Sequence, residues 1–137
     1  MENYFHMHMD LKQIGSISNL GLAHIGDGVF ELLTRSWLCG HNRLTVGRMH
    51  KDTISMVNAA AQAKFADKLL PMLTEEETSI YRRGKNSHGH AVPKSCPPAE
   101  SAKATGREAL CGGLYLLGRT ERINELFVTV MEELYGI

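Results

Sequence analysis

Two carboxylates in this sequence stand among small residues, a setting in which an acidic side chain can meet a metal ion or a substrate. Asp27 lies between Gly26 and Gly28, and Glu108 shares one face of an expected helix with Gly112. Small residues beside a carboxylate indicate that a second helix or a ligand approaches closely. Carboxylates from two helices suit Mg²⁺, which keeps several waters and binds phosphate oxygens. Such a metal activates water against a phosphodiester, so the pair predicts a metal-dependent nuclease.

Simpler interpretations of the two carboxylates stay open at this point. Asp27 can lie on an ordinary solvated helix face, and Glu108 can form a structural ion pair with Arg35 or Arg107. The chain would then be a helical interaction module. A metal-dependent hydrolase of small phosphorylated metabolites would use the same carboxylates on a different substrate.

The second feature is a one-sided group of basic residues between positions 82 and 107. This stretch contains one acidic residue, Glu100, two histidines, His88 and His90, and six basic residues: Arg82, Arg83, Lys85, Lys94, Lys103 and Arg107. In a chain with 15 basic and 15 acidic residues, it forms a local positive patch. Such a patch suits phosphate backbones, and its alternative is a solvated flexible loop. Residues 84–99 are predicted to form a long loop because of Gly84, Gly89, Pro93, Pro97 and Pro98.

Length and composition limit the possible classes of protein. A chain of 137 residues with 43% hydrophobic composition predicts one soluble domain with a real core. It has neither a membrane-spanning apolar run nor the apolar region of a signal peptide. Three scattered cysteines indicate neither a disulfide framework nor a zinc site, and favour a cytoplasmic location. Phosphate-binding glycine loops, two-histidine metal motifs and local nucleophile signatures are also missing.

Apolar residues recur at helical spacing and no strand-like alternation appears, so the sequence predicts an all-α fold. We expect residues 1–17 to form a partly disordered N-terminal segment and residues 18–137 to form a single domain. The expected helices cover residues 20–38, 45–50, 53–70, 74–83, 100–117 and 120–135. Ser18 or Asn19 is the expected N-cap of the first, and Thr74 with Glu77 forms a capping box.

The helix over residues 20–38 is the one around which the chain is organised. Its predicted apolar arc consists of Leu22, Ile25, Val29, Phe30, Leu32, Leu33 and Trp37. The remaining stripe carries Asp27, Glu31 and Thr34, with Arg35 beside it. The two glycines that flank Asp27 each cost about 1 kcal/mol relative to alanine, which again indicates a close approach to the backbone.

Several segments, taken in order, resemble one known family. The segment LAHIGDGVFE (22–31) looks like the signature helix of ribonuclease III catalytic domains, and is closest to the truncated Mini-ribonuclease III branch. Further matches are MHK (49–51), VNA (57–59), LTEEE (73–77), RGKN (83–86), PK (93–94) and TGREAL (105–110). The resemblance covers roughly residues 19–135. The chain ends at Ile137, where a full-length enzyme would continue into a double-stranded-RNA-binding domain.

The resemblance implies an all-α homodimer that cleaves double-stranded RNA with Mg²⁺. It also implies maturation of precursor 23S ribosomal RNA, with a large-subunit ribosomal protein as a partner. By position, Asp27 and Glu108 would be the catalytic, metal-binding carboxylates. The RNA-binding residues would be Arg82 from the positive patch and, by position in the family, Arg83, Lys85, Asn86 and Lys94.

Two departures from the family pattern affect these expectations. Full-length enzymes are acidic at the positions of Ala23 and Thr105, so fewer metal ligands remain here and the number of metals stays open. Expected aromatic residues before the last catalytic helix are replaced by Ser101, Ala102 and Lys103. The alternative function is a non-catalytic RNA-binding or ribosome-assembly protein on the same fold.

Overall fold

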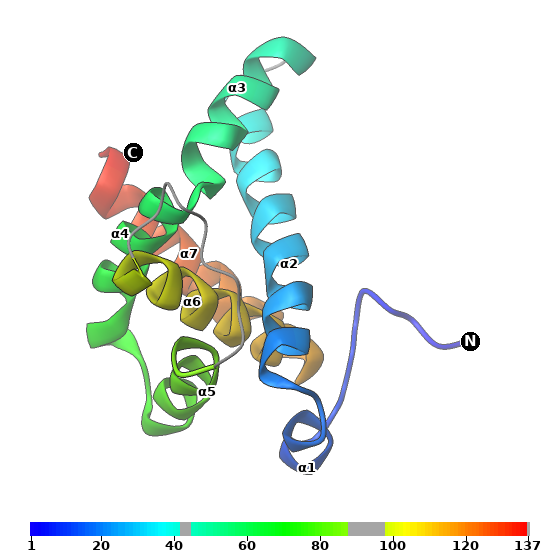
Figure 1. Ribbon diagram of the computed structural model, residues 1–137. Helices are drawn as coiled ribbons and strands as arrows, with labels where there is room; N and C mark the ends of the chain where they lie inside the picture. Colours follow the sequence, from blue (N-terminus) through cyan, green and yellow to red (C-terminus); the bar gives the residue numbers. More distant parts are fainter. Residues whose placement is uncertain (42–44, 88–97, 137) are drawn as a thin grey trace.

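The protein is built from helices, with no strand in the part of the chain that the structure describes, which confirms the predicted all-α class. The computed structural model describes residues 1–41, 45–87 and 98–136. Its elements are α1 (Leu11–Gly15), α2 (Asn19–Gly40), α3 (Val46–Val57), α4 (Ala59–Leu69), the 3-10 turn η1 (Leu70–Met72), α5 (Glu75–Lys85), α6 (Pro98–Leu116) and α7 (Thr120–Tyr135). Helix α6 is central and contacts α2, α4, α5 and α7 (Figure 1). None of the described helices has the length and apolar character of a membrane span.

Side-chain caps fix several helix ends where the sequence predicts them. The Ser18 hydroxyl accepts a hydrogen bond from the backbone N–H of Gly21 at 2.9 Å, which starts α2. Thr74 and Glu77 form the predicted capping box at the start of α5. Helix α7 spans Thr120–Tyr135, the predicted range.

The buried face of α2 differs from the predicted apolar arc. Ile25 and Leu32 are 38% and 58% exposed, whereas the small or polar residues Gly26 and Thr34 are buried. The prediction was wrong for these residues because it ranked positions by side-chain hydrophobicity. Because Gly26 has no side chain, the backbone of α6 can approach α2 at this position. This contact decides which face of α2 is buried.

The predicted helix over residues 53–70 is wrong as a continuous element, because the chain breaks at Asn58 into α3 and α4. The Asn58 backbone is extended, with φ −69° and ψ 160°. Its side-chain oxygen accepts a hydrogen bond from Ala61 N at 2.9 Å, and its amide donates to Ile54 O at 3.3 Å. One asparagine thus ends α3 and caps α4, while the apolar periodicity runs across the break.

The predicted long loop is shorter at both ends than expected. Helix α5 continues through Gly84 to Lys85, and α6 already begins at Pro98. A Cβ at Gly84 would lie 2.6 Å from Thr105 O. Gly84 is therefore a helix-packing residue and not the start of a loop.

The N-terminal segment carries more structure than predicted. Asp10 and Gln13 form a capping box on α1, and Ile14 is only 2% exposed. The backbone N–H of Met9 donates to Leu116 O at 2.8 Å, which ties the segment to the end of α6. The prediction missed this anchor because one buried isoleucine in a short helix leaves no periodic pattern.

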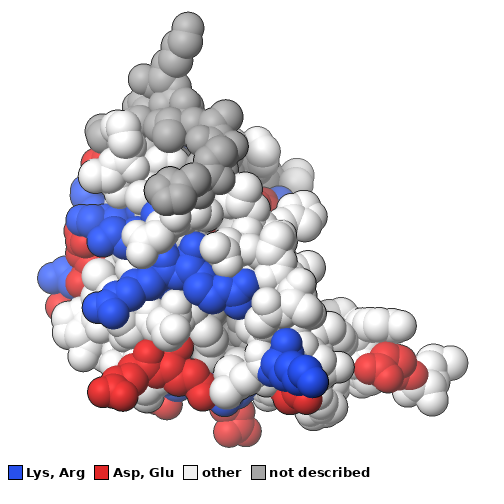
Figure 2. Space-filling model, turned by 60° about the horizontal axis from the view of Figure 1, so that its bottom comes forward, with Lys and Arg blue, Asp and Glu red and all other residues white. Residues whose placement is uncertain are grey.

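The charge of the protein is balanced overall, but basic and acidic side chains gather in different areas of one face. Figure 2 shows Lys and Arg side chains in a band across the face that is lowest in Figure 1, with Asp and Glu side chains below them. Helix α5 contributes to both signs, because Glu75 and Glu76 lie in its first turn and Arg82 and Lys85 in its last. This order is also the one that the helix dipole favours.

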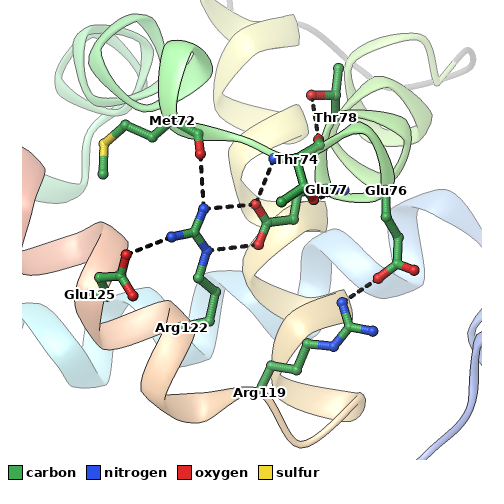
Figure 3. Close-up of polar contacts among 8 residues, drawn as sticks. All are labelled: Met72, Thr74, Glu76, Glu77, Thr78, Arg119, Arg122 and Glu125. Carbon is green, nitrogen blue, oxygen red and sulfur yellow. Dashed lines mark hydrogen bonds and ion pairs between the residues drawn. The ribbon is translucent and has the colours of Figure 1, made fainter.

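A partly buried ion pair joins α5 to α7 (Figure 3). Arg122 Nε donates to Glu77 Oε2 at 2.9 Å, and Arg122 Nη2 donates to Glu77 Oε1 at 3.0 Å and to Met72 O at 2.9 Å. Glu77 is 3% exposed. The hydrogen bonds from Arg122 lower the pKa of Glu77, so this carboxylate stays ionised in the folded protein.

Candidate active site

Helices α2 and α6 cross with their backbones in contact at two glycines. A Cβ at Gly26 would overlap the carbonyl oxygen of Glu108 and would lie 2.8 Å from Gly112 N. A Cβ at Gly112 would in turn overlap the carbonyl of Leu22. Only glycine permits this distance at both positions. The crossing explains the glycine that precedes Asp27, and it brings the two predicted catalytic residues to one place.

Asp27 and Glu108 differ in their environment at this crossing. Asp27 is exposed to solvent, whereas Glu108 is half-buried. Burial raises the pKa of Glu108 from its ordinary value of 4.5 to about 7, while nearby Arg107 lowers it and Asp27 raises it further. The charge of Asp27 thus contributes to the pKa of Glu108, so the two carboxylates interact electrostatically.

No described residue forms a hydrogen bond or ion pair with the carboxylate of Asp27 or Glu108. The two arginines considered as structural partners are engaged elsewhere. Arg35 pairs with Glu31 at 2.7 Å, and Arg107 donates to Gln62 at 2.7 Å. Neither forms the ion pair that the simpler interpretation of Glu108 requires.

The unpaired carboxylates fit a divalent metal with a small protein ligand set. Among the described residues, no group of three or more His, Cys, Asp or Glu side chains is arranged to hold a metal. Mg²⁺ binds through one or two carboxylates, with waters and substrate phosphates completing its octahedron. Asp27 and Glu108 match that requirement, while a dedicated protein cage such as a Ca²⁺ loop is not built from the described residues.

Arg107 is the site residue that the sequence analysis placed wrongly. The sequence groups it with the local positive patch of residues 82–107, but it is 0% exposed. Its guanidinium carbon lies 3.8 Å from the centroid of the Phe30 ring, and Nη1 lies 3.5 Å from Cys111 Sγ. Its Nε has no partner among the described residues. The available signal was its spacing from Cys111 and Ala104, which puts it on the apolar face of α6.

The predicted RNA-binding residues separate into three groups. Arg82, Lys85 and Asn86 are exposed at the end of α5. Arg83 is partly buried, and its guanidinium donates three hydrogen bonds within the protein, to Asn19 Oδ1, Ile14 O and Ile17 O. Lys94, together with His88 and His90, lies outside the described residues.

Lys103 belongs to the same basic stretch but is already paired. Its Nζ lies 2.9 Å from Asp67 Oδ1, and its side chain is 34% exposed. The positive surface near the end of α5 therefore depends mainly on Arg82 and Lys85 among the described residues.

Comparison with known proteins places these features in context. Residues 20–119 match the family described as the Ribonuclease III domain. A Mini-ribonuclease 3 from Symbiobacterium thermophilum is 44% identical over 107 residues, which are 78% of this chain and 82% of the relative. A Mini-ribonuclease 3 from a Thermoanaerobacter species is 41% identical over 121 residues, 86% of this chain and 85% of the relative. A crystal structure of a Fusobacterium nucleatum protein is similar with a TM-score of 0.78 and 31% identity, covering 88% of this chain and 97% of that one.

Proposed function

The chain belongs to the ribonuclease III domain family as an endoribonuclease of the Mini-ribonuclease 3 type, and from this premise we propose that it hydrolyses double-stranded RNA at Asp27 and Glu108 with a bound Mg²⁺. One observation carries the assignment of the site. The α2–α6 crossing brings together two carboxylates that form no ion pair or hydrogen bond with the described residues. A metal ion is the missing positive charge that such a pair requires.

Asp27 and Glu108 would hold the metal, which when bound supplies a Lewis acid and a water of lowered pKa. The protein provides the geometry. The glycine contact fixes the separation of α2 and α6, and the exposed Asp27 faces the solvent from which a duplex would approach. Glu108 is partly buried, and the lower dielectric there strengthens its interaction with a cation.

The proposed RNA-binding surface consists of Arg82, Lys85, Asn86 and Lys94, with Arg83 holding the end of α5 in place. Exposed Arg and Lys side chains suit an A-form duplex, which proteins bind mainly through its shape, phosphates and 2′-hydroxyls. The three internal hydrogen bonds of Arg83 support a positioning role, because they anchor α5 to α1, to the start of α2 and to the segment between them.

A symmetric homodimer would place one Asp27–Glu108 site against each strand, so that both strands would be cut. The outer face of α2 supports such an assembly. Ile25 and Leu32 are exposed there, and Gly28 has no neighbouring atom within 4 Å of a built Cβ. In line with the family resemblance, the proposed substrate is precursor 23S ribosomal RNA, and a large-subunit ribosomal protein is the proposed helper.

The first test is cleavage of a defined RNA duplex by wild type, Asp27→Asn and Glu108→Gln, each with Mg²⁺ or with a chelator. We expect wild type to cut both strands only with Mg²⁺, and both folded variants to lose activity by at least about 100-fold. Glu121→Gln, which removes an exposed carboxylate from α7, is the matched control. Metal-independent cleavage, or full activity in either site variant, would contradict the proposal. Tight duplex binding without cleavage would instead indicate a non-catalytic RNA-binding protein.

A further inference from the structure

A small groove with a largely apolar lining lies between α2 and α3, away from the α2–α6 crossing. Its volume is about 150 Å³, and it is lined by Arg35, Val46, Met49, His50 and Thr53. The groove thus combines one arginine, one histidine and one threonine with two apolar side chains. Pockets that hold whole small molecules measure roughly 300–1,000 Å³. This groove suits a single group of the size of a phosphate.

The hydroxyl of Thr53 supports a ligand in this groove. Thr53 is 4% exposed, and its Oγ1 has no hydrogen-bond partner among the described residues. Other helical threonines satisfy this group internally: Thr78 and Thr129 each donate to the carbonyl four residues earlier, at 2.8 Å. A buried hydroxyl without a hydrogen-bond partner destabilises the folded protein, so a ligand that accepts a hydrogen bond from it is favoured. Thr34 is also unpartnered, but it does not line the groove.

Arg35 connects the groove to the proposed catalytic site, because it lies on the same helix as Asp27. Asp27, Glu31 and Arg35 follow one another at intervals of four residues along one face of α2, so Arg35 lies about 12 Å from Asp27 along the helix axis. Glu31 Oε1 accepts a hydrogen bond from Arg35 Nη2 at 2.7 Å, which orients the guanidinium. The Arg35 side chain remains 60% exposed, so the rest of its donors can reach a ligand.

We propose that the Arg35–His50–Thr53 groove binds a backbone phosphate of the RNA duplex whose scissile bond lies at Asp27 and Glu108. The proposal rests on the proposed function of the protein. An anionic group would accept hydrogen bonds from the Arg35 guanidinium and the Thr53 hydroxyl, and the imidazole of His50 would provide a further donor. The groove would extend the proposed RNA-binding surface from the end of α5 to the C-terminal half of α2.

The test measures binding of a short RNA duplex in chelator, over a series of salt concentrations, with wild type, Arg35→Gln and Thr53→Val. Arg48→Gln is the matched control, because Arg48 is 62% exposed and also lies in an i,i+4 pair, with Asp52 at 3.9 Å, but does not line the groove. We expect Arg35→Gln to weaken binding about tenfold and to reduce the log–log salt slope by about one. Thr53→Val should weaken binding about threefold with an unchanged slope and no loss of Tm.

Three results would overturn the proposal. In the first, both groove variants would bind the duplex within twofold of wild type. In the second, Arg48→Gln would weaken duplex binding as much as Arg35→Gln does. In the third, inorganic phosphate would bind the groove while both groove variants bind the duplex as wild type does. The last would identify a site for a free anion. If wild type neither binds nor cleaves a duplex, the proposed function fails and the groove proposal falls with it. Normal cleavage together with unaffected groove variants would reject the groove alone.

Discussion

The Cα of Gly26 lies directly against the backbone carbonyl of Glu108, so that α2 and α6 touch where Asp27 and Glu108 must meet. Helices usually pack with their axes 8–10 Å apart, separated by side chains. Here glycine on both helices removes that layer at one point. The two carboxylates of the proposed site are therefore positioned by backbone contact between rigid elements, which is more exact than placement on a loop.

Gly26→Ala should disrupt this contact. The added methyl group would overlap Glu108 O and lie 2.8 Å from Gly112 N, and backbone atoms cannot move aside as a side chain can. We expect a loss of about 3 kcal/mol in the free energy of unfolding, together with loss of cleavage. Urea denaturation followed by tryptophan fluorescence measures the first, and duplex cleavage at low temperature measures the second.

Gly28 provides the control, because a Cβ there meets nothing within 4 Å. Gly28→Ala should stabilise the isolated chain by up to about 1 kcal/mol through helix propensity. Gly28→Leu should keep the fold but lose the proposed homodimer, as seen by sedimentation, and activity with it. A dimeric, fully active Gly28→Leu protein would argue against a partner surface at this position.

The stability of the protein should depend on Glu108 at neutral and alkaline pH. Its pKa is about 7 in the folded protein against an ordinary 4.5, so the folded state holds this proton more tightly. The stability gained from the proton is complete below pH 4.5 and is lost as the pH rises through 7. Glu108→Gln should therefore be more stable than wild type at pH 8, by about 2–3 kcal/mol, and similar to it at pH 4.5.

Thermal unfolding of both proteins at the two pH values checks this sign. Mg²⁺ added at pH 8 should raise the Tm of wild type, because an ion that binds only the folded state stabilises it. The Tm of Glu108→Gln should respond less. An equal Tm for both proteins at pH 8 would indicate that Glu108 carries no burial penalty.

The sequence predicts the two carboxylates and most helix ends because these depend on local chemistry. Ser18 and Thr74 cap their helices with side chains close in sequence. Asp27 stands out because two glycines surround it in an otherwise helical pattern. The contact that explains Gly26 joins it to Glu108, about 80 positions away in the sequence. The sequence around Gly26 therefore indicates only that some other group approaches the backbone closely.

The features that sequence analysis missed depend on tertiary packing. Ile25 and Leu32 point outward because the rotation of α2 is set by Gly26 against α6. Arg107 looks like part of a basic stretch, but Phe30 from α2 and Gln62 from α4 enclose its charge. These partners are distant in sequence, and no local pattern identifies them.

Acid should destabilise the protein through Glu77. Hydrogen bonds from Arg122 lower the pKa of Glu77, so its contribution is present above the ordinary value of 4.5 and is lost as the pH falls through the folded value. Glu77→Gln should cost about 3 kcal/mol at pH 7 and should flatten the acid limb of the stability curve. Glu76→Gln, a neighbour in an exposed pair with Arg119, should cost no more than about 1 kcal/mol. Denaturant unfolding between pH 3 and pH 7 compares the two variants.

Arg107 should influence the site through its charge. Because Arg107 lowers the pKa of Glu108, Arg107→Met should raise that pKa further and shift the acid limb of the pH–rate profile upward, by up to about one unit. Arg107→Lys should restore most of the wild-type profile, while Gln62→Leu, which removes its hydrogen-bond acceptor, should leave the profile in place. An unchanged profile in Arg107→Met would limit this arginine to packing.

Two adjacent arginines, Arg82 and Arg83, should have opposite effects when substituted. Arg83→Gln removes three hydrogen bonds that join α5 to residues 14–19, so we expect a loss of about 2–3 kcal/mol in the free energy of unfolding. Arg82→Gln changes an exposed side chain, so stability should stay within about 0.5 kcal/mol. RNA binding should show the reverse: Arg82→Gln should weaken duplex affinity and reduce the salt slope by about one, because one phosphate contact is lost. Arg83→Gln, measured well below its Tm, should keep the wild-type slope. A reduced slope in folded Arg83→Gln would mean that its guanidinium leaves the internal hydrogen bonds to bind RNA.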